Sequence, residues 1–360
     1  MTDEGIPQVK VENETVTVRT SEGMASTVAV IGAFKSNVTT PTVYNNLRDA
    51  KAALGDDATF NGCKVLDKLF MNWSSTYGAS NIIVVNTATS TTSGEVTTWD
   101  KEITSTKLAT ALSSIKGENY DILFIAENLD DAGFTAIKTF EDSEYDLQKP
   151  IGLVAPLVRD NTTASIATAN IFNTGGLFGL INQQYKSEYY DADLDVIESA
   201  AYYTGILCGL KVNQSMTMKE LPGVTGLVTE YGFDTGEDGR LLMNAGITLA
   251  KILDRINNKV YIVKTLLPNG HDVSTERAVN YMIKGFQLVD FLGDPSNTKS
   301  LSSIEGEVES RKQTYLEMDL ANDISATVTK ASATCIDIEL LFTMPGIITL
   351  IDVKVSVEVE

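Results

Sequence analysis

The chain has 360 residues, enough for one large domain or two smaller ones, and 43% of them are apolar, which is sufficient for a sizeable core. It is strongly acidic, with 48 Asp and Glu against 28 Lys and Arg and a net charge of -20 at pH 7. Phosphate backbones and anionic membranes repel such a chain, so the composition argues against binding to nucleic acid and against insertion into a membrane.

Residues that usually carry chemistry are scarce. His271 is the single histidine, and most acid–base, nucleophilic and zinc sites rely on histidine, so we interpret it as a surface residue. Cys63, Cys208 and Cys335 have no C-x-x-C spacing and are expected to be buried reduced thiols. P-loop, G-x-G-x-x-G and G-x-S-x-G patterns are absent from the sequence, so we expect no catalytic, cofactor-binding or metal site.

In chain order, the first predicted elements are short strands in residues 8–20. Apolar residues alternate there in two phases, and a turn or bulge near Asn13 separates them. The four residues of this pattern are Val9, Val11, Val16 and Val18.

From residue 27 onward, buried strands alternate with amphipathic helices. We predict strands over 28–31, 82–85, 122–125 and 151–154, and helices over 43–54, 63–77, 108–115 and 134–145. This alternation is typical of an α/β domain with a mostly parallel sheet. A further helix over 194–211 carries a face of small residues, Ala200, Ala201 and Gly205, suited to close packing against a neighbour.

The second half of the chain changes character after the loops at 221–226 and 234–239. We predict a strand over 260–263, helices over 274–292 and 302–320, and strands over 324–330, 335–342 and 347–359. The predicted organisation is an arm (1–20), an α/β domain (21–235), a C-terminal α+β domain (236–348) and a second arm (349–360).

Two acidic motifs could each be a group of carboxylates with the spacing of a metal site or an ordinary turn or helix start. The loop from Asp234 to Gly239 resembles a calcium loop, but Ala245 occupies the twelfth position, where a bidentate Glu belongs, so we expect a solvated turn. Asp191, Asp193 and Asp195 are either alternate carboxylates of an extended segment or acids at the start of the helix over 194–211.

The last eleven residues form a strict period-2 pattern that runs to the end of the sequence. At about 3.3 Å per residue such a strand reaches roughly 35 Å. It is either the last strand of the chain's own sheet or a donor strand that completes a sheet in another subunit. Its apolar row is Ile351, Val353, Val355, Val357 and Val359.

A series of motifs in the second half resembles contractile tail sheath proteins of bacteriophages and phage-like particles. These motifs are SAAYYTG (199–205), LPGVTGL (221–227), LLMNAGI (241–247), VYIVKTL (260–266) and ERAVNY (276–281). Three features depart from the family pattern and suggest a divergent or minimal sheath. Tyr261–Ile262 replace an aromatic–Gly pair, Lys264 stands where Arg is usual, and the opening reads Ile6-Pro7-Gln8-Val9.

The resemblance implies a structural, non-enzymatic protein that assembles with copies of itself into stacked hexameric rings around an inner tail tube protein, with a baseplate and a tail terminator as further partners. It implies that terminal arms add strands to neighbouring subunits, and that contraction is driven by subunit packing without any cofactor. It also implies that the helix over 302–320 faces the tube, with Glu305, Glu309 and Lys312 as candidate contacts.

Two alternatives stay open at this point. One is a cofactor-binding α/β enzyme that uses the carboxyl ends of the strands after Ile31, Val85 and Ile125. The other is a different ring-forming tail component. The sequence shows no secretory signal pattern and no long apolar run, so we expect the protein in the cytoplasm of the producing cell and then in an assembled particle.

Overall fold

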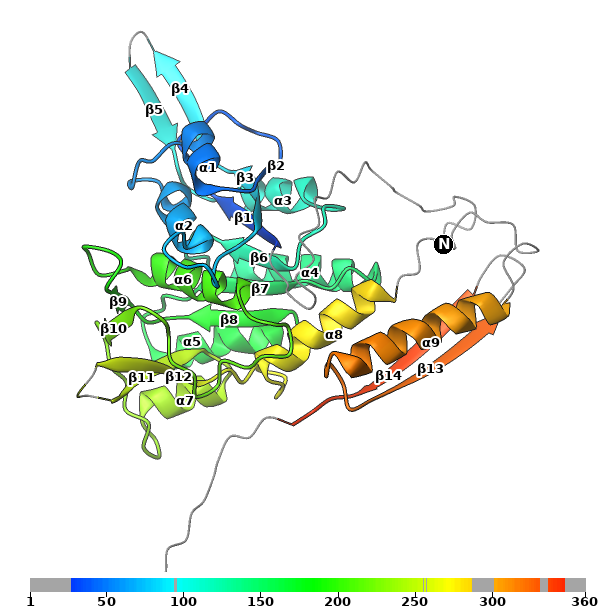
Figure 1. Cartoon of the computed structure of the whole chain (residues 1–360). Helices are drawn as coiled ribbons and strands as arrows, with labels where there is room; N and C mark the ends of the chain where they lie inside the picture. The colour runs from blue at the N-terminus through cyan, green and yellow to red at the C-terminus, as the bar shows by residue number, and fades with distance from the viewer. Residues whose placement is uncertain are drawn as a thin grey trace, which may run out of the picture.

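The computed structural model describes residues 27–93, 96–254, 256, 258–286, 301–330 and 336–346. Its centre is a six-stranded sheet in the order β2-β3-β1-β6-β7-β8 (Figure 1). All neighbouring strands are parallel except β2, which pairs antiparallel with β3 at one edge. The predicted α/β architecture with a mostly parallel sheet is confirmed. The strands are β1 (Thr27–Gly32), β2 (Thr42–Tyr44), β3 (Asn81–Asn86), β6 (Ile122–Ile125), β7 (Gly152–Pro156) and β8 (Leu177–Ile181).

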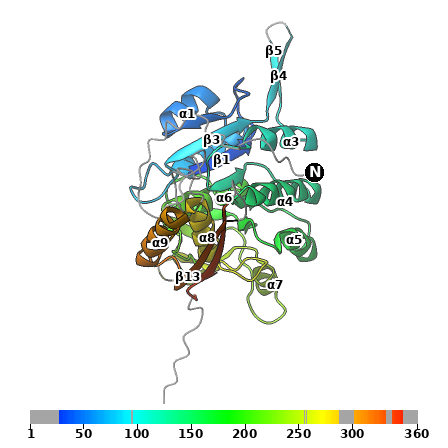
Figure 2. The same ribbon diagram turned by 90° about the vertical axis from the view of Figure 1, so that its right-hand side faces the viewer.

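Helices cover both faces of this sheet, as Figure 2 shows, which explains why its strands are continuous apolar runs. On one face lie α3 (Ser105–Ser114), α4 (Asp131–Asp146), α5 (Thr162–Ala169) and the short 3-10 helix η1 (Asn170–Phe172). On the other lie α1 (Leu47–Leu54), α2 (Asn61–Phe70) and α6 (Val196–Cys208). The small-residue face of α6 meets α2 closely, because a Cβ on Gly205 would lie 2.5 Å from the Lys68 carbonyl oxygen.

Smaller antiparallel pairs surround the sheet. The elements are β4 (Thr89–Ser93) with β5 (Val96–Asp100), β9 (Tyr185–Ser187) with β10 (Val224–Leu227), and β11 (Leu249–Asp254) with β12 (Lys259–Lys264), beside helix α7 (Asp238–Asn244). Apolar residues of α7, β11 and β12 belong to the same large core as the sheet.

The C-terminal elements form a second hydrophobic core. They are α8 (Val273–Gly285), α9 (Leu301–Glu317), β13 (Asp323–Lys330) and β14 (Ile336–Thr343). In Figure 1, α9 and the two strands form a layer beside α8, away from the six-stranded sheet. The domain boundaries at 20, 235 and 348 stay a prediction.

Three predicted helices differ from the structure. The first two residues of the helix predicted over 43–54 belong instead to the edge strand β2, because Val43 and Tyr44 favour extended backbone, and α1 begins only after its N-cap Asn46. The second ends at Phe70, since Met71 adopts a left-handed conformation with φ 45°. The third is the shorter α6, which begins after Asp195.

Some predicted elements lie outside the described residues. These are the strand-forming segments at both ends, including Val9, Val11, Val16, Val18, Ile351, Val353, Val355, Val357 and Val359, and the last part of the predicted helix over 274–292. In the described part of the chain, no helix has both the length and the apolar character needed to cross a bilayer.

Candidate assembly interface

The hairpin of β13 and β14 has two unlike faces. The strands pair in a regular antiparallel register from Asp323–Thr343 to Lys330–Ile336. Residues opposite one another in such a pair lie on the same face of the sheet. One face is therefore apolar, and its cross-strand pairs are Ile324 with Phe342, Ala326 with Leu340, and Val328 with Ile338. The opposite face is mostly polar, but it carries Leu341, which is 68% exposed.

The apolar face packs against α9. Ile304, Val308 and Tyr315 are the buried side chains of this helix, and they share the second core with the apolar strand residues. Tyr315 also contacts α8, where its ring lies edge-on to Phe286 at 5.3 Å between centroids. One face of the small sheet is thus covered by the chain itself.

Among the described residues, the outer edges of this small sheet have no partner strand. β13 and β14 form a hydrogen-bonded ladder with each other and with no other described strand. Each strand carries an outer row of backbone N–H and C=O groups that this ladder does not use. A strand from another chain could pair with such a row.

The outer face of α9 carries the residues predicted to face a tube. Glu305 and Glu309 are exposed, whereas Lys312 is half-buried and forms an ion pair with Glu309 at 3.3 Å. Hydrogen bonds from Gln313, at 2.7 Å, and from Lys312 hold the pKa of Glu309 below its ordinary value. Glu309 is therefore ionised at neutral pH, and this face is negatively charged.

Helix α8 joins the second core to the body through Arg277, which is only 1% exposed. Its Nη2 donates to the carbonyl oxygens of Leu207 at 2.7 Å and Leu210 at 3.0 Å, and its Nη1 to that of Lys211 at 3.4 Å. These carbonyls lie at and after the end of α6, where a helix has free acceptors and a negative dipole end. Arg277 thus caps α6 from inside the protein.

Two more cations form contacts that link α8 and α9 to neighbouring parts of the chain. Lys284 Nζ, near the end of α8, donates to the Tyr120 carbonyl at 2.5 Å and to Asp121 Oδ1 at 3.1 Å. Arg311 of α9 donates to the Gly285 carbonyl and pairs with Glu307 at 2.8 Å. These hydrogen bonds link the body, α8 and the C-terminal layer to one another.

The start of α8 is held by Asp272. Its Oδ1 accepts from the Ser274 backbone N–H at 2.9 Å, which caps the helix. Its Oδ2 accepts from the hydroxyls of Ser215, Thr217 and Thr265 at 2.7–3.1 Å. One carboxylate thus joins the segment at 215–217 to Thr265 and to the start of α8.

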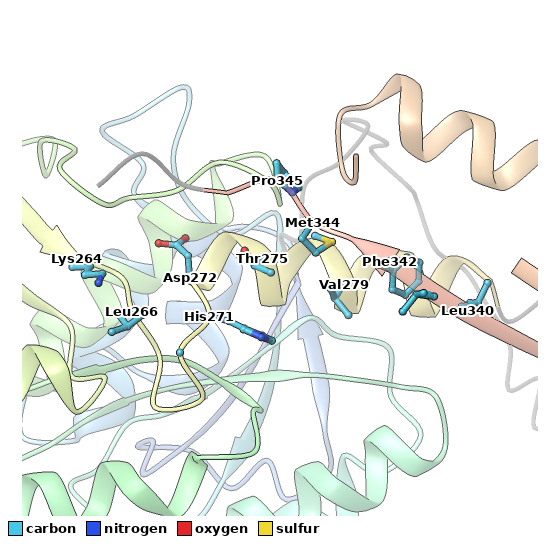
Figure 3. A pocket seen from close by; sticks show the side chains of 12 residues that line it. Lys264, Leu266, His271, Asp272, Thr275, Val279, Leu340, Phe342, Met344 and Pro345 are labelled. Carbon is cyan, nitrogen blue, oxygen red and sulfur yellow. The ribbon is translucent and has the colours of Figure 1, made fainter. Parts of the chain in front are cut away.

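A groove of about 660 Å³ separates the start of α8 from the end of β14. Figure 3 shows Thr275 and Val279 of α8 on one side, and Leu340 and Phe342 of β14 on the other. The groove passes the end of β14 at Leu340, Leu341 and Phe342, and its lining is mostly apolar.

The candidate residues of the sequence do not gather into a reactive centre. His271, at the groove, is exposed, but it has a carboxylate partner that we did not predict, since its Nδ1 lies 2.8 Å from Glu276 Oε1. Cys63 and Cys208 are buried free thiols, as expected, and burial raises the pKa of Cys208 to about 12. Cys335 lies outside the described residues.

The acidic motifs have structural roles. Asp195 is the N-cap of α6 in a capping box with Glu198, which favours the helix-start interpretation. The loop at 234–237 is exposed and leads into α7, with Glu237 accepting a hydrogen bond from the Asp234 N–H at 2.7 Å. Over the described residues, no three His, Cys, Asp or Glu side chains are grouped to hold a metal ion.

An α/β enzyme would use the crevice where the strand order reverses, which in this sheet lies between β1 and β6. The start of α2 is bonded to the loop after β1, since the Gly62 N–H donates to the Ala33 carbonyl at 2.8 Å. Asn61 Nδ2 donates to Glu127 Oε2 at 2.9 Å, which links α2 to the loop after β6.

The chain is similar to solved sheath structures over most of its length. The sheath tail protein from Desulfitobacterium hafniense has a TM-score of 0.63 at 9% identity, covering 88% of this chain and 93% of that one. The one from Listeria innocua has 0.59 at 13%, covering 88% of each. No family model and no curated protein sequence matches.

Assembled particles contain similar chains too. A chain of the 6-fold symmetrised anti-feeding prophage baseplate has a TM-score of 0.67 at 12% identity, with 99% of both chains covered. A chain of the contracted anti-feeding prophage helical sheath has 0.62 at 12%, covering 98% of this chain and 99% of that one. The predicted resemblance is confirmed for the fold: the chain has the fold of contractile tail sheath proteins.

Proposed function

We propose that this protein is a structural subunit of a contractile tail sheath, and not an enzyme. It polymerises as stacked hexameric rings around an inner tube, and contraction drives the tube through a target envelope. The observation that carries the proposal is a sheath-like fold with a two-stranded C-terminal sheet whose outer edges have no partner among the described strands. The partners are other copies, the tube protein, the baseplate and the tail terminator, in a particle assembled in the cytoplasm.

The β13–β14 sheet is the recipient of arms from neighbouring subunits in this proposal. The donor segments are residues 8–20 and 349–360, whose sequences alternate apolar and polar residues. A strand added beside β14 would lie along the groove between β14 and α8, so that its apolar row meets the apolar lining. The added ladder would use the open backbone groups of the edge.

The strength of this link follows from the area that it buries. Burying one valine side chain contributes about 1.5 kcal/mol or more, and the C-terminal segment has five apolar residues in one row. Such an arm would dissociate rarely, so subunits stay connected while the bodies move.

Contraction in this account is a change in packing between rigid pieces. Arg277, Lys284 and Arg311 fix the C-terminal layer to the body, so the arms act as the hinges. The energy comes from the difference in subunit contacts between two states, and no nucleotide is needed. The acidic outer face of α9, with Glu305, Glu309 and the Lys312 pair, faces the tube.

The test of the donor strand compares two neighbouring substitutions that add the same charge. Val355→Asp alters the apolar row, and Ser356→Asp alters the polar row. We expect Val355→Asp and deletion of residues 350–360 to abolish sheath assembly, and Ser356→Asp to leave it intact. Normal contractile tails from the deletion variant would contradict the donor-strand role.

The tube-facing role of α9 has its own test. Reversing the charge of Glu305 and Glu309 to Lys should prevent co-assembly of the sheath with its tube while leaving the monomer folded. Unchanged co-assembly would mean that this face is merely solvated.

A further inference from the structure

The β4–β5 hairpin is a ribbon that extends away from the body of the molecule (Figures 1 and 2). Its described residues are exposed on both faces apart from Ser90 and Trp99 near the base, and Val96 is 64% exposed. The base is held firmly, because the Trp99 ring lies edge-on to Phe60 at 5.5 Å between centroids. The ribbon is thus a fixed projection with no covering layer among the described residues.

A second uncharged segment, which starts at residue 36, lies beside the base of the ribbon. Ser90 Oγ donates to Asn37 Oδ1 at 3.0 Å, and Asn86 Nδ2 donates to the Ser36 carbonyl at 2.5 Å. That segment leads into the edge strand β2, where Val43 is 58% exposed. We call residues 36–43, 89–93 and 96–99 together the threonine-rich surface.

Charged residues are absent from the threonine-rich surface. Its 17 residues include eight threonines and three serines, and none is Asp, Glu, Lys or Arg. At the average of 21% charged residues, a set of this size would carry about four charges. Natural edge strands usually carry charges that prevent pairing with other chains, and this surface has none.

The low charge matters because the chain has a net charge of -20. Two copies repel each other wherever their acidic surfaces meet, and repulsion is weakest where neither copy is charged. Within the described residues, both outer edges of the ribbon and the outer edge of β2 have no partner strand. Threonine also favours extended strands and pairs well across them, as the Thr92–Thr97 hydroxyl contact at 3.1 Å illustrates.

We propose that the threonine-rich surface is a contact between the bodies of two copies of this chain, separate from the contacts of the terminal arms. The inference rests on the proposed self-assembly and adds a second kind of interface to it. The arms provide a persistent link, whereas this uncharged surface lets two acidic bodies approach and pack.

The first test adds charge to the ribbon of the full-length chain. Thr92→Glu with Thr97→Glu places two carboxylates on the ribbon. Thr135→Glu with Thr139→Glu, on the exposed face of α4, is the matched control. We expect the ribbon variant to raise the protein concentration needed for polymerisation, measured by sedimentation, at least tenfold, and the control to change it less than twofold. Thermal melting of the monomers verifies folding.

The second test needs no disruption of the surface. In a Thr92→Cys variant, we expect maleimide to label the new thiol at least tenfold more slowly in polymers than in monomers, after subtraction of the wild-type labelling. Equal rates would show that the ribbon faces solvent and would overturn the inference, as would a control variant that impairs assembly equally. If the wild type polymerises and the Thr92→Glu, Thr97→Glu variant polymerises at the same protein concentration, the proposed contact is refuted while the proposed function stands. A wild type that never polymerises overturns the proposed function as well.

Discussion

Replacing Arg277 tests whether the buried cap of α6 holds the molecule together. Arg277→Met keeps much of the side-chain volume and removes every hydrogen-bond donor. The guanidinium donates to three carbonyl oxygens. In the variant, the carbonyls of Leu207 and Lys211 keep a backbone donor, the N–H groups of Leu210 and Gln214, whereas the Leu210 carbonyl loses its described donor. The carbonyls belong to the end of α6 and the turn after it, so the effect should weaken the contact between α6 and α8.

The magnitude follows from opposing contributions. Leaving the Leu210 carbonyl without a donor costs about 1–3 kcal/mol, and loss of a cation at a helix C-terminus costs up to about 2 kcal/mol. The variant also removes a charge that the wild type holds away from water, and this gain offsets part of the losses. We expect a net decrease of about 2 kcal/mol in the free energy of unfolding, and about 1 kcal/mol for Arg277→Lys, which keeps the charge but not the fork of donors.

The assay is denaturant unfolding of the monomer, followed by the fluorescence of Trp73 and Trp99. Arg240→Met is the matched control, because Arg240 is exposed on α7 and its side chain reaches Thr235 at 3.2 Å. The control should change stability by less than about 0.5 kcal/mol. Equal stabilities of Arg277→Met and wild type would refute the capping role.

Three further predictions concern single side chains. Gly62→Ala should destabilise the fold by about 2 kcal/mol, because its Cβ would lie 2.6 Å from a backbone carbonyl oxygen, whereas Gly306→Ala, with open space on α9, should stabilise it by about 0.5–1 kcal/mol, both measured by denaturant unfolding. Asp272→Asn should cost about 2 kcal/mol, since an amide offers one acceptor atom where the carboxylate has two, and a melting temperature within 1 °C of wild type would contradict this. Glu144 is 1% exposed with an Oε1 that has no described hydrogen-bond partner, and burial raises its pKa. A raised pKa in the folded protein means that ionisation of Glu144 destabilises the fold as pH rises through this pKa. Glu144→Gln should therefore be more stable than wild type by about 1 kcal/mol at pH 8. The difference should vanish near pH 4, where Glu144 is protonated.

The parallel sheet could be predicted because its signal is local. Residues 82–85 and 122–125 are uninterrupted apolar runs, and only strands covered on both faces have that composition. The edge strand β2 was missed because its three residues directly precede an amphipathic helix and were absorbed into its pattern. Short elements give too few residues for periodicity to identify.

The joint between the two cores could not be predicted, since its contacts are distant in sequence. Arg277 donates to carbonyls 66 to 70 residues earlier in the chain, and no sequence pattern near residue 277 predicts these contacts. The pairing of His271 with Glu276 was easier to predict from the sequence, because Glu276 follows five residues later at the start of a predicted helix. The proposal that β13 and β14 receive strands from other subunits required the structure, which shows that their other edges have no described strand partner.

The central claim is that this chain polymerises into a sheath. Electron microscopy of negatively stained, purified full-length protein tests it most directly. The account predicts hollow tubes of stacked rings with a central channel, formed without nucleotide. A protein that stays monomeric at high concentration, and that instead binds a nucleotide or another small cofactor, would contradict it.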